Sequence, residues 1–412
     1  MQRATESQIS AIFKDEYGRA VSVLIGVLGD IDTAEDAVQE AFIEALRTWP
    51  ERGLPPSPPG WIITTARNRA IDRIRRESTR DVRQEQAFRL GGRLAQEGAD
   101  AVFDDTAIPD DRLRLIFTCC HPALNEPARI ALTLKLIGGL TTAEVARAFL
   151  VPEATVAQRI VRAKNKIKRA NIPYRVPESA ELIDRLGSVL AVIYLIYTEG
   201  HTASAGAQLT RIDLAVEAVR LGRVLATLMP DEPEVLGLLA LMLLGESRRP
   251  ARTTADGDLV PLAEQDRSLW DRDLALEGHE LVLRCLRRGR PGPYQLQATI
   301  AATHAAAASA DRTDWPQILA LYDGLYALTP TSVVALNRAV ALAQVAGPAA
   351  ALAEVDALDL DGFHLWHATR GHLLDQLGST AEATAAYRRA ATLTDNDAER
   401  RHLLRRADHS DD

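Results

Sequence analysis

Apolar side chains recur at spacings of three and four residues along almost the whole chain, and no stretch shows the sustained apolar and polar alternation that a sheet would demand. This periodicity predicts an all-α protein. The chain has 412 residues, 47% of them hydrophobic and 25% charged, so it can bury a sizeable core. At roughly 100–200 residues per domain, this length suggests about two to four domains.

The sequence favours a cytoplasmic protein in a reducing environment. Its longest apolar run, Leu186–Tyr197, is shorter than the roughly 18 residues that cross a bilayer, and we expect it to form a buried helix. Residues 1–6 lack the apolar core of a secretory signal. Cys119 and Cys120 are adjacent and Cys285 is distant, so the cysteines cannot form a disulfide framework.

The net charge of −8 conceals a difference between the two halves of the chain. Residues 1–176 carry 26 Lys and Arg against 23 Asp and Glu, whereas residues 177–412 carry 22 against 33. Within the first half, residues 61–93 hold nine Arg against four acids, and residues 154–170 hold six basic residues and no acid. Positive charge gathered in two places predicts two nucleic-acid-binding surfaces.

Two helices are expected at the N-terminus, over Ser7–Leu28 and Ala34–Thr48, and Asp32 with Glu35 has the spacing of a capping box. One face of the second helix is apolar: Val38, Ala41, Phe42, Ala45 and Leu46. On another face acids recur every four positions: Asp36, Glu40 and Glu44. Like charges at this spacing cost about 0.2–0.5 kcal/mol per pair. The acidic face is therefore either simply solvated or a docking surface for a basic partner.

A proline-rich loop, Leu54–Gly60, leads into a basic helix that begins at Trp61 and runs to Arg76. Trp61, Thr65, Ile71 and Ile74 can serve the core, while the charged and polar residues point elsewhere: Arg67, Asn68, Asp72, Arg75 and Arg76. Arginines can hold phosphates, and a loop with an aromatic side chain can receive an unstacked base. The pattern suits a melted nucleic-acid strand, although Arg-rich faces are also common solvated surfaces.

A helix-turn-helix is the strongest local signal. Glu126–Gly138 is an expected helix, Thr141 and Glu144 form a capping box, and a helix over Thr142–Phe149 precedes a basic helix over Glu153–Arg169. Four apolar residues would pack the last two helices together: Val145, Ala146, Val156 and Ile160. Four others would then face the major groove: Thr155, Ala157, Gln158 and Arg159. The alternative is an ordinary helical hairpin with a solvated basic face.

These units resemble a known family. Asp32–Phe42 and Trp61–Arg75 look like the second conserved region of extracytoplasmic-function (ECF) sigma factors of bacterial RNA polymerase, and residues 126–169 look like the fourth region. The segment Glu97–Asp111, with six acids and no basic residue, matches the linker between them. The resemblance covers about 170 residues and implies promoter recognition and transcription initiation with the polymerase core, without enzymatic activity.

The resemblance also implies roles for individual residues. The acidic helix would dock on the clamp helices of the largest polymerase subunit through Asp36, Glu40 and Glu44. The basic helix would capture a flipped base of the −10 element and hold the flanking DNA through Trp61, Arg67, Asn68, Asp72, Arg73, Arg75 and Arg76. The last helix would read the −35 element through Thr155, Gln158, Arg159, Arg162, Lys164 and Lys166. The family's usual Gly-Thr-Val-Lys-Ser-Arg start is here Ala-Thr-Val-Ala-Gln-Arg, which removes a phosphate contact at Ala157 and supplies an adenine reader at Gln158.

An ordinary ECF sigma factor would end near Arg175, so we expect domains at 1–80, 112–176 and 177–412, with a linker at 81–111. In a unit of about 34 residues from His364, small and aromatic residues stand where a tetratricopeptide repeat has them: Gly371, Gly378, Ala383, Tyr387 and Ala390. A degenerate copy precedes it: Ala339, Ala346, Ala351 and Val355. The chain thus resembles an ECF subgroup whose tetratricopeptide-like extension acts in place of a separate anti-sigma factor. Such repeats imply a peptide or protein partner and a regulatory role in cis.

The sequence predicts no catalytic residue, metal or cofactor. Glu-Gly-His recurs at residues 199–201 and 277–279, but without the spacing of a zinc hydrolase. Cys119-Cys120-His121 has no second pair of ligands, and no Gly-Lys-Ser/Thr phosphate loop is present. Residues 247–273, a long loop of mixed charge, would be either an interface or a solvent-exposed insertion. The alternative function is a repeat scaffold or a one-component DNA-binding regulator that recruits no polymerase, which would need neither Asn68 nor the acidic helix.

Overall fold

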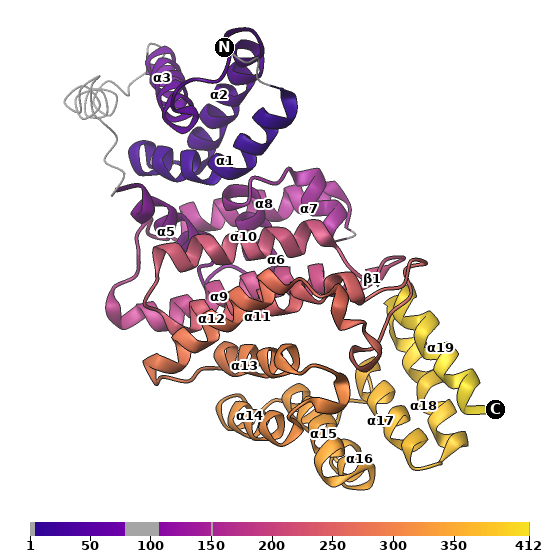
Figure 1. Cartoon of the computed structure of the whole chain (residues 1–412). Helices are drawn as coiled ribbons and strands as arrows, with labels where there is room; N and C mark the ends of the chain where they lie inside the picture. The colour runs from indigo at the N-terminus through magenta and orange to yellow at the C-terminus, as the bar shows by residue number, and fades with distance from the viewer. Residues whose placement is uncertain (1–4, 79–106, 150, 412) are drawn as a thin grey trace. The chain divides into compact units, whose positions relative to one another are not determined.

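The computed structural model of the chain describes residues 5–78, 107–149 and 151–411 (Figure 1). The described residues form two compact units, Met1–Val192 and Ile193–Asp412. Nearly all regular structure in them is helical, which confirms the all-α prediction. The exception is a pair of two-residue strands, β1 (Ala205–Gly206) and β2 (Asp395–Asn396), which pair in parallel.

The first unit begins with three helices, α1 (Glu6–Leu28), α2 (Ile31–Arg52) and α3 (Pro58–Ser78). Aromatic rings join α1 to α2, since the ring centroid of Phe42 lies 4.6 Å from that of Phe13 and 6.5 Å from that of Tyr17. The apolar face expected on α2 is buried at Val38, Ala41, Phe42 and Ala45.

The starts of α2 and α3 differ from the sequence-based expectation. Asp30, not Asp32, caps α2, because its Oδ2 accepts a hydrogen bond of 2.9 Å from the Thr33 backbone N–H. Leu46 is 49% exposed, and Trp49, one turn later, takes the buried place instead. Helix α3 starts at Pro58, inside the expected loop, because proline is tolerated in the first helical turn, where its missing N–H would have no partner.

Five further elements complete the described part of this half of the chain: α5 (Ala107–Cys119), α6 (Glu126–Leu132), a π-helical turn η1 (Thr133–Ile137), α7 (Thr142–Ala148) and α8 (Glu153–Arg169). The predicted linker lies largely outside the described residues, and its end at 107–111 is helical. The second capping box is confirmed: the Thr141 N–H donates to Glu144 over 2.7 Å, and the Glu144 N–H donates to the Thr141 hydroxyl over 3.1 Å. The helix-turn-helix packing residues Val145, Ala146, Val156 and Ile160 are all buried.

Helix α1 packs directly against the helix-turn-helix part within the same unit. A Cβ at Gly18 would lie only 2.6 Å from the Ile137 carbonyl oxygen, so a residue without a side chain is needed there. The Tyr174 hydroxyl donates to the Ser22 carbonyl oxygen over 2.7 Å. The segments expected as two separate sigma domains therefore form one compact body.

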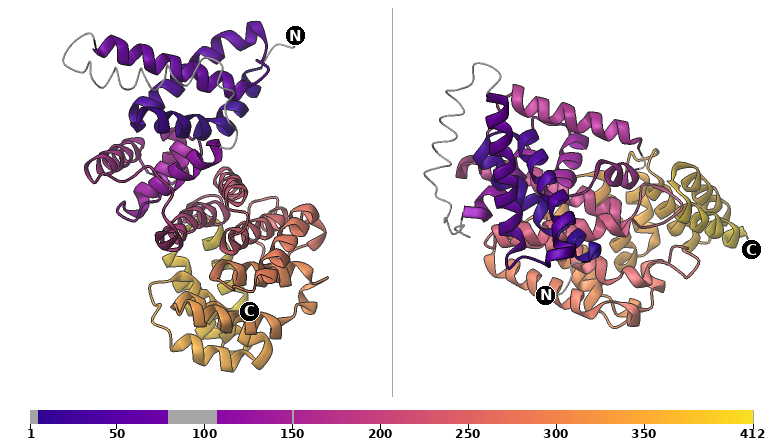
Figure 2. Two further views of the ribbon diagram at one scale, coloured as in Figure 1. Left: turned by 90° about the vertical axis from the view of Figure 1, so that its left-hand side faces the viewer. Right: turned by 90° about the horizontal axis from the view of Figure 1, so that it is seen from above.

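Helix α9 (Ser179–His201) carries the chain from the first unit into the second, and the apolar run predicted there is a largely buried helix. The second unit continues with α10 (Ile212–Leu228), α11 (Pro233–Ser247), α12 (Arg272–Arg288), α13 (Pro293–Ala306), α14 (Trp315–Leu328), α15 (Ser332–Ala346), α16 (Pro348–Asp356), α17 (His364–Gln376), α18 (Thr380–Leu393) and α19 (Asp397–Asp411). Each helix packs mainly on its neighbours in sequence, as in a helical solenoid (Figures 1 and 2).

The small residues of the predicted repeat lie at close helix contacts. Gly371 of α17 faces the Tyr387 ring of α18, and a Cβ there would approach the ring to 3.1 Å. Ala383 and Ala390 are fully buried beside it. Gly378 has φ +77° in the turn between the two helices, a conformation that favours glycine. These contacts suit a tetratricopeptide-like pair, and the assignment itself stays a prediction.

The long loop between α11 and α12 is fixed on its own unit by arginine side chains. Arg252 donates to the His201 carbonyl oxygen and, over 2.9 Å, to the Thr202 hydroxyl. Arg267 donates to the carbonyl oxygens of His304 and Ala307 over 2.6 and 2.7 Å. The loop also contains three short 3₁₀ turns: η2 (Arg249–Ala251), η3 (Leu262–Glu264) and η4 (Arg267–Leu269). It is therefore built into the fold rather than being a free insertion, and its role as an interface stays a prediction.

Candidate nucleic-acid interface

Helix α8 has one buried face and one exposed face, as a major-groove helix requires. Its buried face is made of Val156, Ile160, Ala163 and Ile167. Gln158, Arg162 and Lys166 are exposed, and Thr155 and Arg159 are half-buried. Five of the six residues predicted to contact the −35 element thus have side chains with access to solvent on the described surface of α8.

Lys164 is the exception among the predicted −35 residues. Its side chain is only 15% exposed, and its ammonium lies 2.7 Å from Asp32 Oδ1 and 2.8 Å from Glu35 Oε2. Burial alone would lower the pKa of Lys164, but the two carboxylates outweigh burial and hold that pKa above its usual value. The structure therefore places this lysine on α2 and not on the exposed face of its own helix.

Glu35 is a buried bridging carboxylate and not the cap residue that the sequence suggested. Its side chain is 5% exposed, and Lys135 of η1 approaches its second oxygen, Oε1, to 2.8 Å. Burial would raise the pKa of Glu35, but Lys164 and Lys135 together lower it. Sequence reasoning missed this role and missed Lys135 altogether, although Lys135 is the one basic residue in the apolar stretch 130–140.

The acidic face of α2 is partly neutralised from within its own unit. Arg73 of α3 lies 2.9 Å from Asp36, and Arg69 lies 3.3 Å from Glu44. The repulsion between acids four residues apart is therefore offset without an external partner. Glu40 is exposed, as are the apolar side chains of Ile43 (51%) and Leu46 (49%) on the same helix. Sequence reasoning missed the exposure of these two apolar residues.

Helix α3 presents the residues predicted to contact the −10 element. Asn68 and Asp72 are exposed, and Arg67 and Arg73 are half-buried. The half-buried Trp61 packs edge-on against Trp49, with ring centroids 5.2 Å apart. Arg75 and Arg76 belong to α3 by their backbone, and their side chains lie outside the described residues.

The cysteines and histidines flagged in the sequence are structural where the model describes them. Cys119 and Cys120 are buried, and burial raises the pKa of the Cys120 thiol to about 11. Burial lowers the pKa of His201 to about 4, and its ring lies 3.1 Å from the Tyr197 hydroxyl. Across the described ranges, no three His, Cys, Asp or Glu side chains are placed to hold a metal ion.

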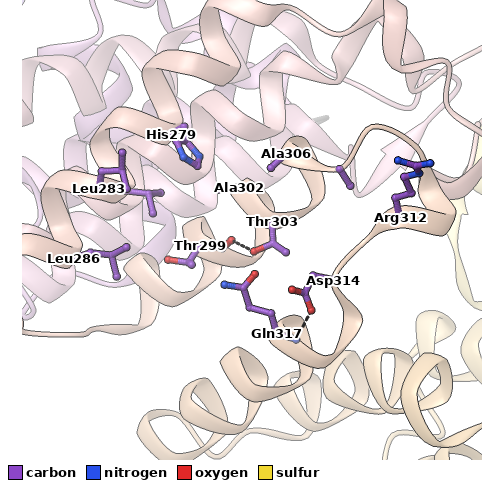
Figure 3. Close-up of a pocket in the computed structure, with 12 residues that line it drawn as sticks. His279, Leu283, Leu286, Thr299, Ala302, Thr303, Ala306, Arg312, Asp314 and Gln317 are labelled. Atoms are coloured by element: carbon purple, nitrogen blue, oxygen red, sulfur yellow. Dashed lines mark hydrogen bonds between the residues drawn. The ribbon is translucent and has the colours of Figure 1, made fainter.

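The second unit contains an apolar groove between α12, α13 and α14 (Figure 3). Its volume is about 310 Å³. His279, from the second Glu-Gly-His motif, and the exposed Leu283 and Leu286 line one side. Asp314 and Gln317 form a polar edge on the other side, where Asp314 caps α14 through the Gln317 N–H. A larger cavity of about 680 Å³ is lined by Arg267, His304, Trp315, Tyr322 and residues of α15.

Three protein-family models match the chain. Sigma-70 region 2 matches residues 12–80, and Sigma-70 region 4 matches residues 114–167. A family of unknown function (DUF6596) matches residues 185–286. The first two matches cover α1 to α3 and α5 to α8, which are the elements that carry the predicted DNA-binding residues.

Similar proteins extend these matches. The uncharacterized protein R00370 of Rhizobium meliloti (strain 1021) is 43% identical over 395 residues, which cover 95% of this chain and 93% of that protein. The ECF RNA polymerase sigma factor SigK of Mycobacterium ulcerans (strain Agy99) is 31% identical over 157 residues, 38% of this chain and 81% of that protein. SigK of Mycobacterium tuberculosis (strain ATCC 25618 / H37Rv) is 30% identical over 164 residues, 40% of this chain and 85% of that protein. No solved structure matches the chain. None of the described helices is both long and apolar enough to span a membrane.

Proposed function

This chain belongs to the ECF sigma factors of bacterial RNA polymerase, which act in promoter recognition and transcription initiation, and from that premise we propose how its surfaces divide the work. Helix α2 binds the clamp helices of the largest polymerase subunit, α3 opens the −10 element, and α8 reads the −35 element. Members of this family are initiation factors and not enzymes.

The observation that carries the proposal is the geometry of α7 and α8. The second helix of this pair has a buried apolar stripe, and its opposite face carries amide and basic side chains in the order that base reading requires. Gln158 can donate to and accept from an adenine edge, while the exposed Arg162 and Lys166 suit phosphates. Phosphate contacts set affinity, and Gln158 with Arg159 sets sequence preference.

The −10 role rests on the exposed polar face of α3. Asn68 is exposed one and a half turns beyond the short 53–57 loop, and Trp61 stands at the start of the helix. An unstacked base can hydrogen-bond to the amide and stack on an aromatic ring. Because Trp61 already packs against Trp49, it forms a wall of the base site and not a free platform.

The polymerase-binding role rests on α2. Ile43 and Leu46 provide an exposed apolar centre, and Glu40 and Glu44 provide a charged rim, which is the anatomy of a protein interface. Asp36 and Glu44 must exchange Arg73 and Arg69 for a basic partner or share them with it. The apolar pair thus supplies binding energy, and the acids supply steering and register.

The extension is proposed to regulate initiation through contact with a protein or peptide partner. The apolar groove in Figure 3 offers a place for such a partner. Cutting the chain after Val176 is a poor test, because α9 contributes to the first unit, where Arg185 donates to the Phe117 carbonyl oxygen over 2.7 Å. Substituting the exposed Leu283 by arginine leaves both units whole. Transcription by the purified variant should equal that of the wild type, and any change that cell extract produces in the wild type should disappear in the variant.

The experiment that tests the assignment is transcription of genomic fragments by core polymerase supplied with the full chain. We expect discrete start sites that depend on the protein. Glu40→Lys should weaken association with core polymerase, whereas Glu51→Lys, the same charge change at another exposed position of α2, should alter it much less. Binding to promoter fragments without association with core polymerase would instead favour a DNA-binding regulator and overturn the proposal.

A further inference from the structure

An ion cluster joins three segments of the first unit that are far apart in sequence. We define it as Asp32 and Glu35 of α2, Lys135 of η1 and Lys164 of α8. The contacts run from Lys135 to Glu35 Oε1 over 2.8 Å, from Glu35 Oε2 to Lys164 over 2.8 Å, and from Lys164 to Asp32 over 2.7 Å. Each oxygen of the Glu35 carboxylate thus has its own ammonium partner.

The ion cluster is shielded from solvent at its centre. Exposure of the side chains falls from 67% at Asp32 through 16% and 15% at the two lysines to 5% at Glu35. A charge pair in such a place is only weakly screened by salt. Losing one partner leaves an uncompensated buried charge, so the cluster is costly to open by halves and favours an all-or-none change.

The surrounding packing shows that the cluster closes a shaped interface. Gly18 touches the backbone of Ile137, next to the η1 turn that carries Lys135. The Tyr174 hydroxyl, beyond the end of α8, donates both to Ser22 of α1 over 2.7 Å and to Asp111 of α5 over 3.1 Å. Charge, shape and hydrogen bonds therefore hold the α1–α2 part against the helix-turn-helix part at several points.

The cluster competes with DNA for the same helix. Lys164 lies on α8 between Arg162 and Lys166, and its ammonium can contact either the α2 carboxylates or a phosphate oxygen, but not both. Lys168 of the same helix also acts on α2, because Lys168 and Lys164 contribute to lowering the pKa of Asp30, although burial opposes them. The carboxylates of α2 thus occupy basic groups of α8 in the way that a DNA backbone would.

We propose that the Asp32–Glu35–Lys135–Lys164 cluster is an intramolecular latch, which holds the free protein closed and withholds α8 from −35 DNA until the latch opens. Its occupant is this chain itself: α2 covers the inner end of α8. The proposal rests on the assignment of α8 to promoter DNA for its consequence, but the latch itself is tested without DNA.

The test is a distance measurement on the free full-length protein. Thr64→Cys in α3 and Val161→Cys in α8 place one dye on each side of the latch, at exposed positions. The native Cys119, Cys120 and Cys285 are buried and will label slowly. We expect a closed population with high energy transfer, and Glu35→Gln should raise the ratio of open to closed molecules about tenfold or more. Glu51→Gln, which removes the same charge from an exposed site on α2, should leave that ratio unchanged.

A second variant guards against loss of folding. Lys135→Met removes a latch residue that lies on no proposed DNA-binding surface, and it should also raise the open fraction, while circular dichroism reports an unchanged helix content. Transfer efficiency equal to that of the wild type in both folded variants would overturn the latch.

The DNA arm separates the latch from the assignment of α8. If the wild type is mostly closed, Glu35→Gln and Lys135→Met should tighten binding to a −35 duplex by up to about the factor by which they open the protein. Opening without tighter binding would overturn the masking of α8. Failure of the proposed function has a different signature, because Gln158→Ala would then leave duplex preference unchanged whether the latch is open or closed.

Discussion

Replacing Gly18 by alanine should loosen the contact between α1 and η1. The new Cβ would lie 2.6 Å from the Ile137 carbonyl oxygen and 3.0 Å from its Cα, and these main-chain atoms cannot rotate away. Overpacking of this kind costs about 1–3 kcal/mol, against which the better helix propensity of alanine returns about 0.5–1 kcal/mol. We expect a net loss of about 1–2 kcal/mol in the free energy of unfolding of the first unit.

Hydrogen exchange read by mass spectrometry is the assay, because it reports each unit separately where a single melting curve would mix them. Peptides of α1 and η1 should exchange faster in Gly18→Ala, and peptides of the second unit should not change. Gly187→Ala is the matched control: it also lies in a helix of the first unit, but no atom lies within 4 Å of the added Cβ, so it should be neutral or stabilising. Unchanged protection of α1 and η1 in Gly18→Ala would refute the packing described for this unit.

Three other outcomes are expected. Gln158→Ala should change the preferred −35 sequence by about 1–3 kcal/mol per base contact in a binding-site selection, whereas Lys166→Ala should weaken all sites alike and lower the salt slope by about one phosphate contact; the reverse result would mean that α8 faces DNA differently. The second unit should lose stability as pH falls from about 6.5 to about 4, because His201, facing Glu246, Arg248 and Arg252, stays neutral in the folded state while the unfolded chain takes up a proton, a loss on the order of 3 kcal/mol; His201→Gln should flatten the urea midpoint over that range. Gly371→Ala should destabilise α17 and α18 by about 1–3 kcal/mol in hydrogen exchange, unless the Tyr387 ring can move aside.

The helix-turn-helix could be predicted in detail from sequence because its signals are local. Thr141 and Glu144 cap α7 as their spacing indicated, and α8 has the predicted bounds Glu153–Arg169. The apolar residues at three- and four-residue spacing on α8 are the buried ones. Caps and amphipathic stripes depend on neighbours within one or two turns, and the sequence contains those neighbours.

The ion cluster could not be predicted because its partners are brought together only by tertiary packing. Glu35 and Lys164 stand 129 positions apart, and nothing near Glu35 distinguishes a bridging carboxylate from a cap residue. The same limit explains the exchange of Leu46 for Trp49, since which of two apolar residues on adjacent turns is buried depends on the position of α3. Arg252 and Arg267, which order the long loop, likewise depend on carbonyl groups more than 30 residues away.

The arginines of α3 illustrate how the structure changes a sequence argument without removing its conclusion. The acids of α2 were interpreted as needing an external basic partner, yet Arg73 and Arg69 already accompany two of them. Both pairs are exposed, so each contributes only about 0–1 kcal/mol and can be exchanged for polymerase or DNA at little cost. The stronger evidence for a docking surface is the exposure of Ile43 and Leu46.

Permanganate footprinting of thymines at the −10 element, on a promoter bound by core polymerase and the full chain, tests the central claim most directly. The account predicts reactive thymines with the wild type. Asn68→Ala should retain association with core polymerase and with duplex −35 DNA but lose most of that reactivity. Promoter binding by the wild-type complex with no reactive thymine, or full reactivity in Asn68→Ala, would contradict the assignment of α3 to strand opening.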